Sequence, residues 1–211
     1  MSPSLKSRAQ AAIWGVCVAD ALGGPVQFKD PGTFKPITCL RKVAPFDQPA
    51  GSVSTSYMEV YVTNLNRSYS DDGSMTLALA CSFNKSNMQY NHTLSIQYFV
   101  EWLRNGHFST VSHSWDVGRS TRISLGQWEK YGIEKGDFEL AQVMVNGRLE
   151  YEEYSGNGSL MRIVPIGLVY WRDSRLAREI ARTHGQITHP SLACVEACEA
   201  YTELVCKVMN G

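Results

Sequence analysis

Charge of one sign, long apolar runs and paired cysteine motifs are all missing from this chain. Its 20 basic and 20 acidic residues cancel, and no run of Lys and Arg exceeds two residues, so no electrostatic footprint for nucleic acid or an anionic membrane is expected. No apolar stretch approaches the roughly 18 residues of a membrane span, and the first residues lack the apolar segment of a secretory signal. We therefore expect a cytoplasmic protein, with the nucleus as the alternative.

Six cysteines are present, but no two of them form a Cys-x-x-Cys pair. Most lie among apolar residues in helix-like segments, where cysteine behaves as a small hydrophobic side chain, so we expect reduced thiols. Of the 211 residues, 44% are hydrophobic and 19% are charged, which is the composition of one soluble globular domain over residues 1–211. No repeat or linker divides this domain, and we expect a monomer.

Apolar residues recur at helical spacing through most of the chain, while residues 29–69 are rich in Pro, Gly, Ser and Thr. That segment shows only a short β-like run, Tyr57 to Thr63, and so long a loop in a compact domain is usually functional or disordered. The pattern therefore predicts an all-α protein with long loops. The expected helices cover residues 5–22, 75–83, 93–105, 119–131, 159–172, 174–184 and 190–209.

Two adjacent carboxylates, Asp71 and Asp72, follow Ser70 directly before the helical pattern that begins at Met75. A helix N-terminus favours acidic side chains and serine is a good N-cap residue, so capping alone explains the triplet. The same side chains also offer the oxygen ligands that a hard cation prefers. Taken alone, the triplet favours the capping interpretation, because acidic first turns are ordinary.

Asp20 is the unusual member of the first expected helix. It falls four residues after Val16 on the apolar stripe, so a carboxylate points toward the interior at the C-terminal end of a helix. Both burial and the helix dipole oppose that placement. Either a donor or a cation compensates the charge, or Asp20 caps a neighbouring loop. The run Gly23-Gly24-Pro25 then ends the helix.

A glycine-punctuated loop, Ser155-Gly-Asn-Gly-Ser-Leu-Met-Arg162, runs into the helix expected from residue 159. Backbone N–H groups at such a helix start form an anion site that suits phosphate or diphosphate, although a plain turn is the more ordinary interpretation. His189 precedes the last helix, with Pro190 expected at its first position, and is by itself a loop residue. The segment Trp115-Asp116-Val-Gly118 also leads into a helix and indicates little alone.

Five segments in order along the chain carry a family pattern. They are Gly15-Val-Cys-Val-Ala-Asp20-Ala-Leu-Gly23, Ser70-Asp-Asp-Gly-Ser-Met-Thr-Leu-Ala-Leu-Ala80, Trp115-Asp-Val-Gly118, Gly156-Asn-Gly-Ser-Leu-Met-Arg-Ile-Val-Pro-Ile-Gly167 and Thr188-His-Pro190. Together they resemble the ADP-ribosylglycohydrolase family, which includes the dinitrogenase-reductase-activating glycohydrolases and the J1 crystallins. Each segment is modest alone, but the set in this order is specific and spans most of the chain apart from residues 29–69.

The resemblance implies an all-α orthogonal multi-helix bundle and a two-magnesium centre that hydrolyses the bond between ADP-ribose and an acceptor. Family members bind metal through a Thr-Asp-Asp triplet, and Ser70, Asp71 and Asp72 occupy that place, with Asp71 and Asp72 as the catalytic residues. Two cations would orient the ribose hydroxyls, activate water and stabilise charge as the bond breaks. By the same resemblance the substrate pocket is lined by Gly156, Asn157, Gly158, Asp116, Gly118 and His189.

The chain departs from the family pattern at three places. Gln27 stands where the family usually carries Glu, which keeps an oxygen but removes a negative charge. The family continues to a C-terminal Gly-Asp-Thr-Asp-type motif with further metal carboxylates, whereas no Asp follows Asp173 here. We therefore expect an incomplete domain with at most one magnesium site. Residues 53–67 look like an insertion, and translated intron sequence is one hypothesis for it.

The leading functional expectation is magnesium-dependent hydrolysis of ADP-ribosyl conjugates, with ADP-ribose or ADP-ribosylated proteins and small molecules as partners. The alternative is a catalytically impaired member that binds ADP-ribose or serves a structural, crystallin-like role. A third possibility is an unstable fragment, because removing part of a bundle exposes apolar helix faces.

Overall fold

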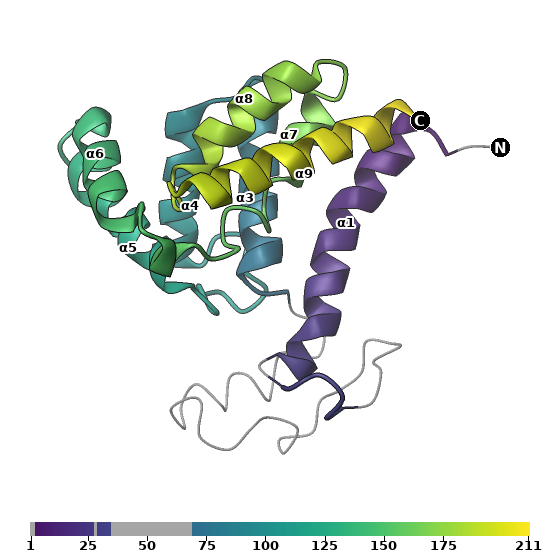
Figure 1. The fold of residues 1–211 in the computed structure, drawn as a ribbon, viewed down its shortest axis with the longest axis horizontal. Helices are drawn as coiled ribbons and strands as arrows, with labels where there is room; N and C mark the ends of the chain where they lie inside the picture. Colours follow the sequence, from purple (N-terminus) through teal and green to yellow (C-terminus); the bar gives the residue numbers. More distant parts are fainter. Residues whose placement is uncertain (1–2, 28, 35–68) are drawn as a thin grey trace.

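A computed structural model describes residues 3–27, 29–34 and 69–211 of the chain, and within these ranges all regular structure is helical (Figure 1). The predicted all-α class is therefore confirmed for the described residues. The elements are α1 (Leu5–Gly23), η1 (Gly24–Val26), α3 (Asp71–Lys85), α4 (His92–Asn105), α5 (Arg119–Gln127), η3 (Trp128–Ile133), α6 (Phe138–Leu149), η4 (Glu152–Tyr154), α7 (Val164–Val169), α8 (Ser174–Gly185) and α9 (Leu192–Asn210).

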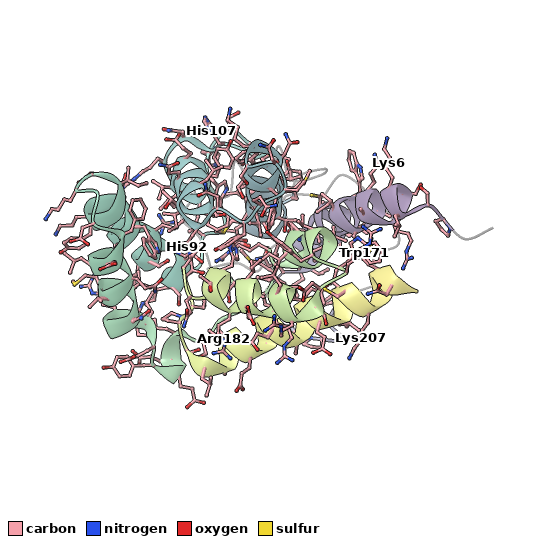
Figure 2. The ribbon with its side chains drawn as sticks, turned by 90° about the horizontal axis from the view of Figure 1, so that it is seen from above. Lys6, His92, His107, Trp171, Arg182 and Lys207 are labelled. Carbon is pink, nitrogen blue, oxygen red and sulfur yellow. The ribbon has the colours of Figure 1, made fainter. Side chains whose placement is uncertain are left out.

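Two helix pairs form crossing layers. The α3–α4 pair stands behind the α8–α9 pair in Figure 1, and the view from above in Figure 2 shows the same two layers side by side. On α8, Arg182 pairs with Glu199 of α9 at 2.5 Å. Because the pairs cross at a steep angle in Figure 1, the bundle is orthogonal, as expected.

The central helix α3 is amphipathic because its large apolar residues recur every four positions. Met75, Leu79 and Phe83 share one face and are all buried in the main core. From the adjacent helix α4, Ile96 and Phe99 join the same core. Burial of this face fixes the direction of α3 and therefore the position of the acidic residues at its start.

Helix α1 packs less closely than the central helices. A groove of about 650 Å³ lies between α1, α7 and α9, and its lining is mostly apolar. Trp14 of α1 is 69% exposed, and Leu204 and Val208 of α9 are also exposed. Among the described residues, no helix is long and apolar enough to cross a bilayer.

Several expected boundaries were wrong. The helix expected over 159–172 is confined to Val164–Val169, because residues 158–162 form turns. The helix expected over 119–131 ends at Gln127 and continues as the π-helical turn η3. Pro190 is not at the first position of the last helix, which begins at Leu192 after Ser191. No helix was expected over Phe138–Leu149, where the structure has α6.

Two expectations fall on residues that the structure leaves undescribed. The β-like run Tyr57 to Thr63 and the insertion at about 53–67 both lie outside the described ranges. Reduced thiols were expected, and the five cysteines among the described residues are free: Cys17, Cys81, Cys194, Cys198 and Cys206.

Candidate functional site

Asp20 caps the N-terminus of α3. Its Oδ2 accepts hydrogen bonds from the backbone N–H of Ser70 at 2.7 Å and of Gly73 at 2.9 Å, and its Oδ1 accepts from the Ser70 hydroxyl at 2.7 Å. These donors compensate the carboxylate that the sequence places at the end of α1. Ser70 itself makes no side-chain capping bond to α3, so the expectation that its hydroxyl caps the helix was wrong.

Asp71 and Asp72 lie in the first turn of α3, within a group of four carboxylates. Burial, followed by the charges of Asp72, Asp116 and Asp20, raises the pKa of Asp71 to about 8. Burial, followed by Asp20 and Asp116, raises the pKa of Asp72 to about 6. Asp71 is only 7% exposed. Asp71 therefore points into the protein. Both carboxylates share their electrostatic environment with Asp20 and Asp116, which come from distant segments of the chain.

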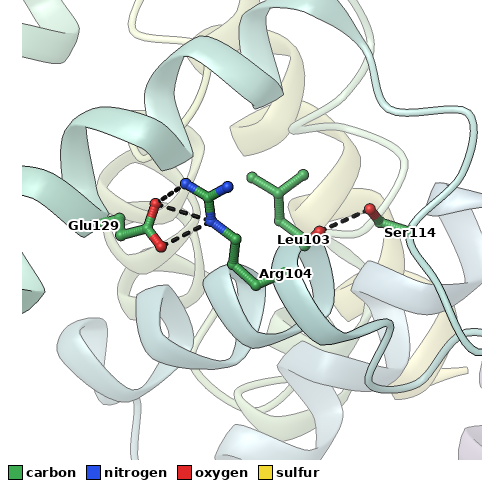
Figure 3. Close-up of polar contacts among 4 residues, drawn as sticks. All are labelled: Leu103, Arg104, Ser114 and Glu129. Atoms are coloured by element: carbon green, nitrogen blue, oxygen red, sulfur yellow. Dashed lines mark hydrogen bonds and ion pairs between the residues drawn. The ribbon is translucent and has the colours of Figure 1, made fainter.

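Asp116 reaches this acidic group from the loop before α5. The loop is tied to the end of α4, where the Ser114 hydroxyl donates to the Leu103 carbonyl at 2.8 Å (Figure 3). Asp116 adopts a left-handed backbone conformation with φ of 56°, which few non-glycine residues do. Its Oδ2 accepts a hydrogen bond from the Gln27 amide. The departure from the family pattern at Gln27 thus lies in direct contact with a predicted site residue.

The glycine loop continues into turns rather than into a helix. The backbone N–H of Met161 donates to the Asn157 carbonyl at 3.0 Å, and α7 begins only at Val164. The helix start expected at residue 159 was therefore wrong, and the plain turn, which the sequence favoured over an anion site, is confirmed. Asn157 is exposed at the tip of the loop, while Gly158 is buried.

Gly158 permits a close approach between the loop and His189. A Cβ added at Gly158 would lie 2.7 Å from His189 Cε1 and 3.0 Å from Thr121 Oγ1. A Cβ at Gly156 would lie 3.5 Å from His189 Nε2. A Cβ added at Gly118, at the start of α5, would lie 3.9 Å from the same Thr121 Oγ1. The structure thus brings together four of the six residues predicted to bind substrate.

Arg162 connects the glycine loop to Thr188 and His184 through hydrogen bonds from its guanidinium. It is fully buried, and its Nη1 donates to the Gly158 carbonyl, its Nη2 to Thr188 Oγ1 at 2.8 Å, and its Nε to His184 Nε2 at 3.2 Å. Its guanidinium also lies over the Phe99 ring at 4.8 Å. No role was predicted for Arg162 from the sequence, although an arginine between Met161 and Ile163 in an apolar run is the available signal.

Two parts of the site are neighbours: the acidic end, formed by Asp71 and Asp72, and the glycine-loop end, formed by residues 156–158 with Arg162 and His189. The Thr76 hydroxyl of α3 donates to the Asp72 carbonyl at 2.7 Å and lies 3.5 Å from the Met161 carbonyl. Burial lowers the pKa of Arg162 to about 10, and the nearby Asp71 is among the groups that oppose this shift. Asp71 therefore stands within electrostatic reach of the residue that holds Gly158.

A metal centre is not preassembled in the described part of the chain. No group of three or more His, Cys, Asp or Glu side chains within residues 3–27, 29–34 and 69–211 is placed to hold a metal ion. Magnesium, however, is often bound through one or two carboxylates while it keeps several waters. The chemistry of Asp71 and Asp72 fits such a site, and a nearby cation would lower both raised pKa values.

The fold matches a solved structure described as "ADP-ribosylglycohydrolase-related protein complex". The TM-score is 0.68 at 24% identity, over 98% of this chain and 58% of that chain. Residues 1–211 match the family model described as ADP-ribosylglycohydrolase. The chain therefore belongs to the ADP-ribosylglycohydrolase family, and both the resemblance and the bundle fold expected from it are confirmed.

Two curated relatives are ADP-ribosylarginine hydrolases Tri1. The protein of Pseudomonas putida (strain GB-1) is 23% identical over 205 residues, which are 97% of this chain and 47% of the relative. The protein of Serratia proteamaculans (strain 568) is 25% identical over 207 residues, which are 97% of this chain and 48% of the relative. The chain thus spans about half the length of the curated relatives it matches.

Proposed function

We propose that the chain carries the ADP-ribose site of a hydrolase that cleaves the glycosidic bond between ADP-ribose and an acceptor. The observation that carries the proposal is the meeting of the Asp71–Asp72 pair with the Gly158 loop, through Arg162 and the Thr76–Met161 contact. The names of both curated relatives favour an ADP-ribosylated arginine as the substrate. Because the chain spans about half the length of those relatives, hydrolysis by this chain is part of the proposal.

One magnesium ion, held by Asp71, Asp72 and the Ser70 hydroxyl oxygen, is part of the proposal. Ser70 Oγ lies 3.3 Å from Asp71 Oδ1, so the two oxygens already face a common region. When bound, magnesium supplies a Lewis acid and lowers the pKa of a coordinated water. Asp71 and Asp72 would act as the catalytic residues by holding the ion and accepting hydrogen bonds from water and ribose.

The other predicted residues would bind the ligand. Exposed Gly156 would allow an ADP-ribose oxygen to approach the backbone closely, buried Gly158 holds His189 against the loop, and Asn157 at the exposed tip would contribute an amide. His189, Asp116 and Gly118 would complete the lining of this site. Asp116 retains a free lone pair for a ribose hydroxyl even while it accepts from Gln27.

The test measures release of ADP-ribose from an ADP-ribosylarginine conjugate, with magnesium and with EDTA. We expect release by the wild type with magnesium and none by an Asp71→Asn/Asp72→Asn double variant, which keeps the side-chain shapes. Asp30→Asn, at an exposed position outside the site, is the matched control and should retain release. Equal release by the wild type and the double variant would remove the catalytic assignment.

A binding protein without catalysis is the second candidate, and the Gln27–Asp116 contact favours it. An amide replaces a carboxylate there, so one potential metal ligand is neutral and already engaged by a site residue. Calorimetry with free ADP-ribose distinguishes the candidates, since the binding protein takes up ADP-ribose while releasing none from conjugates. If the protein neither binds ADP-ribose nor releases it from conjugates, both candidates are overturned.

A further inference from the structure

Arg162 is the only side chain in its buried network, among the described residues, whose hydrogen-bonding direction is fixed in advance. Arginine donates through every N–H and accepts nothing, whereas the neighbouring Thr188 hydroxyl and the imidazoles of His184 and His189 can each donate or accept. Burial lowers the pKa of Arg162 only to about 10, so the guanidinium stays charged at neutral pH. Its donors therefore decide which way the neighbouring bonds run.

One arm of the network passes through Thr188 to His189. Arg162 Nη2 donates to Thr188 Oγ1 at 2.8 Å, and the same oxygen lies 2.8 Å from His189 Nδ1. Thr188 is fully buried, and the described residues offer its hydroxyl proton no other acceptor than that nitrogen. If Nδ1 carried a proton instead, the hydroxyl proton would be left unsatisfied in the interior, at a cost of about 1–3 kcal/mol. His189 Nδ1 is therefore the acceptor.

The neutral imidazole must then carry its proton on Nε2. Burial, followed by the charge of Arg162, lowers the pKa of His189 to about 3, so the ring is neutral at physiological pH. Nε2 lies on the side of the glycine loop, 3.3 Å from the position of a Cβ added at Gly158 and 3.5 Å from one added at Gly156. The N–H of His189 thus faces the loop proposed to hold ADP-ribose.

We propose that Arg162 is a positioning residue that acts through the Thr188 hydroxyl to fix His189 as its Nε2–H tautomer, a neutral hydrogen-bond donor to a ligand oxygen beside Gly156 and Gly158. The role of His189 as a donor to a ligand oxygen rests on the proposed function, whereas the assignment of its tautomer does not. The donor serves a hydroxyl or phosphate oxygen of ADP-ribose without changing its charge over the neutral pH range.

The bond from Arg162 to His184 serves as an internal control for the effect of Thr188 on His189. Arg162 Nε donates to His184 Nε2 at 3.2 Å, so His184 carries its proton on Nδ1, which lies 3.4 Å from the Tyr90 hydroxyl. This arm does not pass through Thr188. A change at Thr188 should therefore alter the tautomer of His189 and leave that of His184 as it was.

The test is ¹⁵N NMR of the protein labelled at histidine, which distinguishes protonated from unprotonated ring nitrogens. The His189 signals are assigned by their loss in His189→Gln. We expect the Nε2–H form in the wild type, a shift toward Nδ1–H in Thr188→Val, and restoration in Thr188→Ser. Thr202→Val is the matched control, because Thr202 is a buried threonine whose hydroxyl has no hydrogen-bond partner among the described residues.

Affinity for ADP-ribose is measured on the same variants by calorimetry. Loss of one oriented hydrogen bond should weaken binding about tenfold in Thr188→Val, and Thr188→Ser should recover it. An Nδ1–H ring in the wild type, or an unchanged His189 in Thr188→Val, would overturn the relay. A wild type with the Nε2–H ring that binds no ADP-ribose would overturn the proposed function and leave the relay standing.

Discussion

The two ends of the site contain opposite kinds of titratable groups, and burial moves both toward neutrality. At the acidic end, burial is the first cause of the raised pKa values of Asp71 and Asp72. At the glycine-loop end, burial is the first cause of the lowered pKa values of His184 and His189. At neutral pH Asp71 therefore needs a nearby cation to be mostly ionised, whereas the neutral imidazoles can each donate a hydrogen bond without one. The two ends are built for different parts of a ligand.

The largest effect should come from Arg162→Met, which removes the cation of the glycine-loop end. The Gly158 carbonyl, Thr188 and His184 would each lose a buried donor, so we expect a loss of about 3–5 kcal/mol in the free energy of unfolding. Urea denaturation measures it. Arg172→Met, at an exposed arginine over the Trp171 ring, should cost less than about 1 kcal/mol. Similar losses in both variants would contradict the role of Arg162.

Gly158→Ala should separate the loop from His189. The added Cβ would lie 2.7 Å from His189 Cε1, so the ring must move, and we expect a cost of about 1–3 kcal/mol with loss of ADP-ribose binding. Thermal unfolding and calorimetry measure the two effects. Gly147→Ala is the control, because no atom lies within 4 Å of the added Cβ in that helix and alanine is the better helix former. Unimpaired binding by Gly158→Ala would argue against a ligand at this loop.

Asp71→Asn should change the pH dependence of stability at the acidic end. With a folded pKa of about 8 against an unfolded value of about 3.9, Asp71 binds a proton more tightly when folded, so its contribution to stability is lost as pH rises from about 4 to about 8. Relative to wild type, the variant should gain stability across that window by at least about 1.4 kcal/mol, the equivalent of one pKa unit. Denaturation at pH 5 and pH 8 without divalent ions measures the gain.

Asp30→Asn, at an exposed position, is the control for this titration and should show no comparable gain. Adding magnesium at pH 8 should stabilise the wild type more than Asp71→Asn, since the ion favours the ionised carboxylate. A pH profile that is identical in the wild type and Asp71→Asn would show that Asp71 is not buried as the structure has it.

The sequence predicted those parts of the molecule that depend on periodicity. The apolar spacing of Met75 and Leu79 marked α3, and the acidic residues ahead of them were placed correctly in its first turn. In α6, by contrast, only Ala141, Val145 and Leu149 are buried. So narrow a stripe with a small first residue gives a weak periodic signal, which is why that helix was missed.

The long-range bonds of the site could not be read from the sequence. Asp20 was recognised as an anomaly, but its partners at Ser70 and Gly73 follow only from the packing of α1 against α3. The same holds for Arg162, whose contacts with Thr188 and His184 join segments more than 20 residues apart. Local patterns identify which residues are unusual, whereas tertiary packing decides what each of them contacts.

The smallest effect on stability, and the sharpest comparison of the two ends, should come from Gln27→Glu. The amide that donates to Asp116 becomes a carboxylate, so without metal the variant should lose about 1 kcal/mol at neutral pH through the lost hydrogen bond and the repulsion between the two carboxylates. The added charge faces the acidic end only. We therefore expect tighter magnesium binding, measured by calorimetry, and an unchanged NMR signature of His189. Equal magnesium affinity in the wild type and Gln27→Glu would mean that position 27 does not face the ion, and the proposed site would then be limited to the first turn of α3.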